Sequence, residues 1–226
     1  MADTNEMREK EKCSSDLPLV IGIGASAGGL EALQQFFQNM PGNSGLCFVV
    51  IQHLSPDYKS LMADILGKHT EMNVLQAENG MEVKPDTVYL IPPKNNMTLK
   101  EGRLYLTEFI HGMLNHPIDA FFASLAKEQK ERAIAVVMSG TGSDGTSGIK
   151  AVKENGGLVI VQKPDTAKFD GMPRSVINTG LADFILSPDE IVDEILNFSN
   201  ILRSSSPRRR KFCFRTRRLL RRSTRS

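Results

Sequence analysis

The strongest constraint on the fold of this chain is an alternation of short apolar runs with amphipathic stretches. The apolar runs are continuous, which is typical of parallel strands that are buried on both faces of a sheet. Three strand–helix pairs stand out: Pro18–Ile23 with Gly29–Asn39, Leu46–Gln52 with Tyr58–Lys68, and Ala133–Met138 with Thr146–Asn155. The pattern predicts an α/β fold with a doubly wound, mostly parallel sheet and helices on both faces.

Weaker signals indicate the remaining elements. Ser187 precedes Pro188 and two acidic residues, so it is expected at the N-cap of a last helix that ends near Leu202. The other expected elements are antiparallel structure at Thr87–Pro92 and in a hairpin at Met97–Leu106, and late strands at Leu158–Gln162 and Leu181–Leu186.

Charge divides the chain into unequal parts. Of the 28 Lys and Arg, 11 lie from Arg203 onward, where there is no acid, which leaves 17 basic and 26 acidic residues before that point. We expect a disordered lead at 1–16, one folded domain at 17–202 and a basic low-complexity tail at 203–226. The tail holds too few apolar side chains to offset the entropy of ordering its backbone in isolation.

Composition excludes several classes of protein. No apolar run reaches the roughly 18 residues that span a bilayer, and the charged start holds no signal peptide, so a cytoplasmic protein that is not embedded in a membrane is expected. The tail lacks aromatic residues spaced for base stacking, and no specific nucleic-acid partner is expected. The cysteines form no CxxC pair and are expected to be reduced thiols; they are Cys13, Cys47 and Cys213.

Chemistry is expected at the carboxyl ends of the strands, where ligands bind in open parallel sheets. Three predicted strands are followed there by Ser26, His53 and Asp144, the first and last of them within glycine-rich turns. These are the residue types of a nucleophile, a general base and the acid that orients the base. Because a serine hydroxyl needs a neighbouring base at neutral pH, the three predict a serine hydrolase with this catalytic triad.

Each of these residues also has a simpler interpretation. Ser26 could cap the helix after it, His53 could be a satisfied histidine at a strand end, and Asp144 could be the N-cap of its own helix. Their coincidence at the same end of three strands favours the catalytic interpretation. The other histidines have no metal-ligand spacing and are expected on the surface or in loops, so no metal is predicted; they are His69, His111 and His116.

Two rival motifs overlap the first turn. Gly22-x-Gly24-x-x-Ala27 matches the dinucleotide-binding fingerprint, but that site requires an acid at the end of the second strand, where the chain has His53. Gly24-x-Ser26-x-Gly28 matches the nucleophile elbow of the α/β-hydrolases, which run serine, acid, histidine along the chain. The order in this chain is serine, histidine, aspartate. We therefore keep the prediction of ester hydrolysis but expect a fold other than that of the α/β-hydrolases. A nucleotide-binding oxidoreductase and a catalytically inactive receptor-binding module remain as alternatives.

On these motifs the chain resembles the catalytic domain of the chemotaxis protein-glutamate methylesterases, the CheB family, from about Leu17 to Leu202. The motifs that carry the resemblance are Ile23–Gly29, Ile51–His53, Ser139–Gly145, Val88–Pro93 and Phe169–Arg174. The resemblance implies hydrolysis of γ-glutamyl methyl esters on a methylated chemoreceptor, or on another methylated signalling protein, with release of methanol. It also implies that neither a metal nor an organic cofactor is needed.

Two features of this sequence differ from those of the usual members of that family. Those members carry an N-terminal receiver domain, for which residues 1–16 leave no room, so control of the esterase in cis is not expected. The segment Asn115–Phe122 and the residues around Ser143-Asp144 look closest to esterase modules that are fused to a methyltransferase. The sequence leaves the oligomeric state open.

Overall fold

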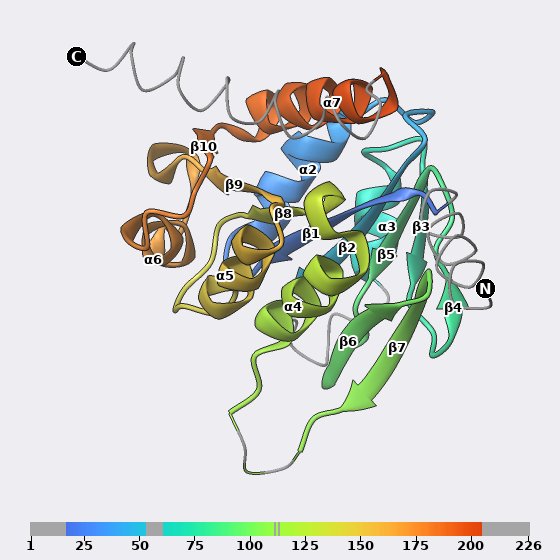
Figure 1. Ribbon diagram of the computed structural model, residues 1–226, viewed down its shortest axis with the longest axis horizontal. Coiled ribbons are helices and arrows are strands. Elements are labelled where there is room, and N and C mark those ends of the chain that lie inside the picture. Colours follow the sequence, from blue (N-terminus) through green and yellow to red (C-terminus); the bar gives the residue numbers. More distant parts are fainter. Residues whose placement is uncertain (1–16, 53–60, 111, 113, 205–226) are drawn as a thin grey trace, which may run out of the picture.

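The structure is a computed structural model that describes residues 17–52, 61–110, 112 and 114–204 (Figure 1). The predicted disordered lead, His53 and His111 lie outside the described residues. So do the first three residues of the predicted helix Tyr58–Lys68 and all of the basic tail after Ser204.

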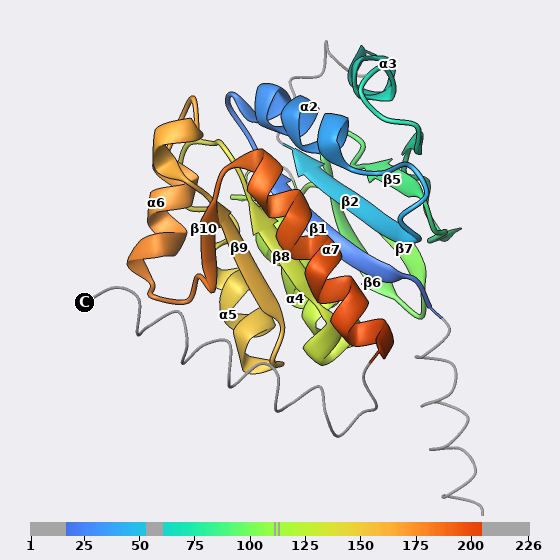
Figure 2. The same ribbon diagram turned by 90° about the horizontal axis from the view of Figure 1, so that it is seen from above.

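A seven-stranded sheet forms the centre of the molecule (Figures 1 and 2). Its strands run in the order β10-β9-β8-β1-β2-β5-β3, and each of the six pairings is parallel. The strands are β1 (Leu19–Ala25), β2 (Leu46–Gln52), β3 (Asn73–Gln76), β5 (Thr87–Leu90), β8 (Ile134–Val137), β9 (Leu158–Gln162) and β10 (Phe184–Leu186).

Helices cover both faces of this sheet, as Figure 2 shows from above. The core on one face is completed by α2 (Gly29–Asn39), α3 (Leu61–Gly67) and α7 (Pro188–Ser204). The core on the other face is completed by α4 (Pro117–Gln129), α5 (Thr146–Glu154) and α6 (Gly171–Asn178). Short 3-10 turns occupy Lys130–Arg132 and Pro164–Thr166. The predicted doubly wound α/β fold is confirmed.

Burial on both faces explains the continuous apolar runs of the sequence. Within β1 every residue is buried, and successive side chains point to opposite faces of the sheet. Ile21 and Ile23 join the core under α2 and α7, whereas Val20 joins the core under α4 and α5. A strand between two helical layers needs an apolar residue at every position, which is the pattern that predicted it.

A second, antiparallel sheet of three strands lies beside α4 and has the order β4-β7-β6. Its strands are β4 (Met81–Glu82), β6 (Asn95–Lys100) and β7 (Arg103–Glu108). The predicted hairpin is therefore present. The prediction of antiparallel structure at Thr87–Pro92 is wrong, because β5 pairs in parallel with β2 and β3. All four residues of β5 are buried, as in the other central strands.

The order of the strands locates the crevice in which such folds bind ligands. From β1 the chain adds strands on one side of the sheet, and from β8 onward it adds them on the other side. The strand order thus reverses between β1 and β8, and ligands of open α/β sheets bind beyond the carboxyl ends of the strands at such a point. Ser26 directly follows β1, and Asp144 lies in the loop after β8.

Candidate active site

The turn that carries Ser26 is bonded directly to the loop that carries Asp144. The backbone N–H of Ser26 donates to the carbonyl of Ser139 at 3.0 Å, and the N–H of Met138 donates to the carbonyl of Gly24 at 2.9 Å. A Cβ atom at Gly140 would lie 3.0 Å from the Cβ of Ser26 and would also collide with Met172. A side chain at residue 140 would therefore crowd both the serine and Met172.

Ser26 does not cap the helix that follows it. Gly28 holds the N-cap position of α2 in a left-handed conformation, with a φ of 68°. The turn is closed by a hydrogen bond of 2.9 Å from the N–H of Gly29 to the carbonyl of Ser26. The hydroxyl of Ser26 makes no hydrogen bond to any described residue and is partly exposed, so it is available to a base and a substrate.

Asp144 is buried, and backbone N–H groups surround its carboxylate. Oδ2 accepts from the N–H of Ile118 at 3.1 Å, and Oδ1 accepts from the N–H groups of Asp119 at 3.0 Å and Gly145 at 2.9 Å. The first two donors belong to the first turn of α4, and the N-terminus of a helix stabilises a negative charge. The position of Asp144 is thus fixed by the first turn of a helix, where Ile118 lies 26 residues earlier in the chain.

His53, the predicted general base, lies outside the described residues. Its chain neighbour Gln52 is the last residue of β2 and pairs in register with Ala25, the chain neighbour of Ser26. The ends of the two strands that precede the serine and the histidine therefore lie side by side. The triad itself stays a prediction.

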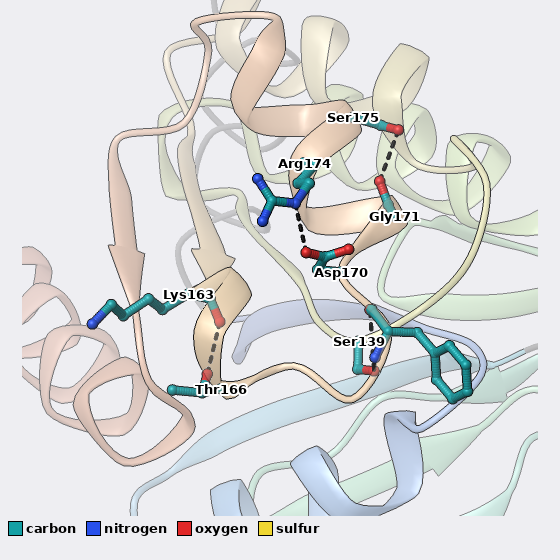
Figure 3. Close-up of polar contacts among 8 residues, drawn as sticks. Ser139, Lys163, Thr166, Asp170, Gly171, Arg174 and Ser175 are labelled. Atoms are coloured by element: carbon teal, nitrogen blue, oxygen red, sulfur yellow. Dashed lines mark hydrogen bonds and ion pairs between the residues drawn. The ribbon is translucent and has the colours of Figure 1, made fainter.

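Hydrogen bonds among Ser139, Gln162 and Phe169 hold this site together. The buried Ser139 donates its N–H to Oε1 of Gln162 at 2.8 Å, and its hydroxyl donates to the carbonyl of Ala27 at 2.9 Å. The same hydroxyl accepts the N–H of Phe169 at 3.0 Å (Figure 3). The serine turn, the end of β9 and the loop before α6 are thereby joined. Sequence reasoning noted Ser139 and Phe169 only as parts of motifs.

The start of α6 completes one side of the site. Figure 3 shows Arg174 directed at Asp170, one turn earlier, and the Nε–Oδ2 distance is 2.5 Å. The hydroxyl of Ser175 lies within hydrogen-bond distance of two carbonyls, those of Gly171 at 2.9 Å and Gly142 at 3.1 Å. The carbonyl of Phe169 accepts the N–H of Gly140, and the N–H of Met172 donates to the carbonyl of Gly140, so the motif Phe169–Arg174 packs against the loop that carries Asp144.

His116 is the residue near the site that sequence reasoning missed. It is the N-cap residue of α4, and its Nδ1 lies 3.8 Å from Oδ1 of Asp144. A signal was available, because Pro117 stands at the first helical position and Asp119 in the first turn. His116, Asp119 and Asp144 offer ligand atoms within 4.8 Å of one another. The carboxylates, however, already accept backbone N–H groups, which is helix capping, and we assign no metal to them.

Asp119, beside the site, and Cys47, in the core, both have a raised pKa. Burial, and secondarily the charge of Asp144, raise the pKa of the Asp119 carboxyl. Burial also raises the pKa of the Cys47 thiol far above its ordinary value, so this cysteine is not a nucleophile.

Comparison with known proteins identifies the family. The chain matches the family described as CheB methylesterase over residues 21–195. It belongs to the CheB methylesterase family. It is also similar to the crystal structure of the Thermotoga maritima CheB methylesterase catalytic domain, with a TM-score of 0.72 and 33% sequence identity. That match covers 79% of this chain and 97% of the solved one.

Three relatives illustrate how much of each protein the chain spans. It is 34% identical to the protein-glutamate methylesterase/protein-glutamine glutaminase of Thermotoga maritima, over 78% of this chain and 53% of that protein. A putative enzyme of the same name from Leptospira interrogans is 32% identical over 76% of this chain and 91% of its own length. An uncharacterized 104.1 kDa protein of Rhodobacter capsulatus is 51% identical over 58% of this chain but only 14% of its own length.

These findings confirm the predicted family and, through the names of the relatives, support the prediction of a protein-glutamate methylesterase over its alternatives. Among the described residues, no helix has the length and apolar character that crossing a membrane requires.

Proposed function

We propose that this chain hydrolyses γ-glutamyl methyl esters in a protein substrate, with Ser26 as nucleophile, His53 as general base and Asp144 as the acid that orients the base. The observation that carries the proposal is the bonded pair of loops at the switch between β1 and β8. One loop presents a serine hydroxyl without a partner among the described residues, and the other holds a buried carboxylate on the N-terminus of α4.

The reaction has two steps, acylation of Ser26 and hydrolysis of the acyl-enzyme. The Ser26 oxygen attacks the ester carbonyl while His53 takes the hydroxyl proton, and the same proton then passes to the departing methoxide, which leaves as methanol. A water molecule gives a proton to His53 and attacks the acyl-enzyme, and the Ser26 oxygen leaves with that proton, which frees the glutamate. Asp144 stabilises the imidazolium that forms in each step.

The oxyanion of each tetrahedral intermediate needs hydrogen-bond donors. The candidates are the backbone N–H groups of Ala27 and Thr141. Ala27 follows Ser26 in the serine turn, and Thr141 lies in the exposed loop after β8. Within the described residues neither N–H donates to a protein acceptor. Free donors of this kind are what an oxyanion site requires.

The names of the relatives suggest a methyl ester on a protein glutamate. The proposed substrate is a methylated chemoreceptor or another methylated signalling protein, as the resemblance to the CheB family implies. The same relatives are named glutaminases, and the same acyl chemistry would release ammonia from a glutamine side chain. A cytoplasmic location fits the free, buried thiol of Cys47.

The alternative of dinucleotide binding is disfavoured by the packing over the glycine turn. A Cβ at Gly28 would lie 2.7 Å from the Cβ of Lys168 and 3.0 Å from the ring of Phe169. Lys168 and Phe169 thus fill the space on the Cβ side of Gly28, which narrows the room beside this glycine. We expect no dinucleotide affinity in a titration.

The decisive experiment is methanol release from a methylated receptor preparation. Ser26→Ala should lower turnover by at least about 10³-fold without unfolding the protein, because the nucleophile is lost. Ser204→Ala, at the exposed end of α7, is the matched control and should behave as the wild type. Retained activity in Ser26→Ala would refute the assignment of the nucleophile, and ammonia release from an unmethylated receptor would test the glutaminase reaction.

A further inference from the structure

Helices α4 and α5 lie against each other (Figure 1). A carboxylate next to each helix binds the start of the other one. Asp144, just before α5, accepts the N–H groups of Ile118 and Asp119 in the first turn of α4. In return, Oδ1 of Asp119 accepts the N–H of Gly148 in the first turn of α5 at 2.7 Å. The N-cap residues of both helices make no side-chain capping bond of their own.

The two helix ends are in close steric contact at this exchange. A Cβ atom at Gly148 would lie 2.9 Å from the carbonyl oxygen of Asp119 and 2.7 Å from the Cβ of Phe122. A Cβ atom at Gly145 would lie 2.9 Å from the side chain of Ile118. The separation of the helices is therefore set by contact, and the hydrogen bond from Gly148 fixes how α5 is oriented on α4.

This contact bears directly on Asp144, because Gly145 belongs to the same turn. The N–H of Gly145 donates to Oδ1 of Asp144, and Gly145 is also the N-cap residue of α5. A shift of α5 on α4 would therefore move the carboxylate relative to its donors at Ile118 and Asp119.

We propose that Asp119 is a positioning residue for the esterase: by accepting the N–H of Gly148, its side chain holds α5 on α4 and keeps the Asp144 carboxylate where it orients the general base. The inference rests on the proposed function, since it assigns to Asp144 the role given above. Among the described residues Asp119 makes no hydrogen bond to Ser26 or Gln52, and its link to the site is the bond from its own N–H to Asp144.

The role requires an acceptor oxygen and not a charge. The carboxylate of Asp119 is half-buried and close to the carboxylate of Asp144 and the ring of His116. An asparagine in its place could accept the same N–H without the like charge beside Asp144. The acceptor and the charge can therefore be separated by substitution.

The experiment compares Asp119→Ala and Asp119→Asn with Glu190→Ala. Glu190 is the matched control, because its carboxylate also accepts a backbone N–H at a helix start, but on α7 at the opposite face of the sheet. Methanol release gives kcat and KM, and hydrogen exchange gives the protection of the amides of Ile118, Asp119, Gly145 and Gly148. Asp119→Ser is the replacement if Asp119→Ala does not fold.

Asp119→Ala should lower kcat by about tenfold or more with KM nearly unchanged, because a small misplacement of a catalytic group has a large effect on rate. Asp119→Asn should restore most of kcat, and Glu190→Ala should not lower it. Asp119→Ala should also speed amide exchange at Ile118 and Asp119, the donors to Asp144.

Three results would overturn the inference: an unchanged kcat in Asp119→Ala, no rescue by Asp119→Asn, or unchanged exchange at Ile118 and Asp119. The exchange measurement needs no activity. If the wild-type protein releases no methanol, the proposed function fails, and the exchange data still decide whether Asp119 holds Asp144 in place.

Discussion

For the carboxylate of Asp144, the sequence indicates an acid at the site, whereas the tertiary structure decides which groups that acid binds. Its place after a strand and in a glycine-rich turn indicates an acid at the site, and it also allows an N-cap for the helix that follows. In the structure Gly145 takes that N-cap position, and Asp144 binds the start of α4 instead. A local motif cannot reveal a partner 26 residues away.

Replacing Asp144 by asparagine should reduce both turnover and stability. An amide has one acceptor oxygen and directs an NH2 group at backbone donors, so at least one N–H of α4 loses its partner. We expect kcat to fall by roughly 10²- to 10⁴-fold, as the base loses its orienting acid. The free energy of unfolding should fall by about 1–3 kcal/mol, measured by urea titration. A variant with full turnover would contradict the assigned role.

At the scale of elements, α4 is the helix that determines the site, although the alternation of the sequence does not predict it. The antiparallel hairpin precedes α4, so this helix does not follow a strand of the main sheet and is not part of the strand–helix alternation. Its apolar face, which includes Phe121 and Phe122, packs directly on β1, where Gly22 and Gly24 leave room for it. This close approach brings the N-terminus of α4 to the loop after β8.

Gly24→Ala should disturb that approach. The new Cβ would lie 2.6 Å from Cγ2 of Ile118, so the first turn of α4 must move away from β1. Overpacking of this kind costs about 1–3 kcal/mol of unfolding free energy, and methanol release should fall as Asp144 loses its donors. Gly67→Ala is the control, because a Cβ there meets nothing within 4 Å, and it should leave both quantities nearly unchanged.

The start of α7 should make stability depend on pH. The N–H and the hydroxyl of Ser187 both donate to Oε2 of Glu190, at 2.9 and 2.8 Å, and these bonds lower the pKa of that carboxyl. A lowered pKa stabilises the fold above the pKa of the unfolded chain, and this contribution is lost as the pH falls through the folded-state pKa. The predicted capping role of Ser187 thus takes the form of a donor to Glu190.

Glu190→Gln removes this titration. Between about pH 6 and pH 3, the urea midpoint of the wild type should therefore fall more steeply than that of Glu190→Gln, since the other carboxyls are common to both proteins. Parallel pH profiles would show that the Ser187–Glu190 bonds contribute nothing to the acid sensitivity of the fold.

At the scale of the whole molecule, the chain joins an acidic body to a strongly basic end. Before Arg203 there are 17 basic and 26 acidic residues, and from Arg203 onward there are 11 basic residues and no acid. Such a charge difference affects association with charged partners more than it affects the fold. The loops of the proposed site belong to the body: the Ser26 turn lies between β1 and α2, and the Asp144 loop lies between β8 and α5.

Deleting residues 204–226 should leave turnover unchanged at moderate salt, because no residue of the proposed site belongs to that segment. Methanol release by the deletion variant and the intact chain, measured across a range of salt concentrations, tests this. If deletion lowers turnover on receptors, and added salt lowers the intact protein to the same level, the tail is an electrostatic docking arm and the prediction is wrong.

The sequence by itself determined the order of most strands and helices, the family, and the residue types that end the central strands. Those are local properties: the periodicity of burial specifies β2 and α2 to the residue, and glycines mark the tight turns. Tertiary structure alone decided that β5 lies parallel between β2 and β3, and that Asp144 and Asp119 bind the start of each other's helix. Those facts depend on contacts between segments far apart in the chain, which local preference does not specify.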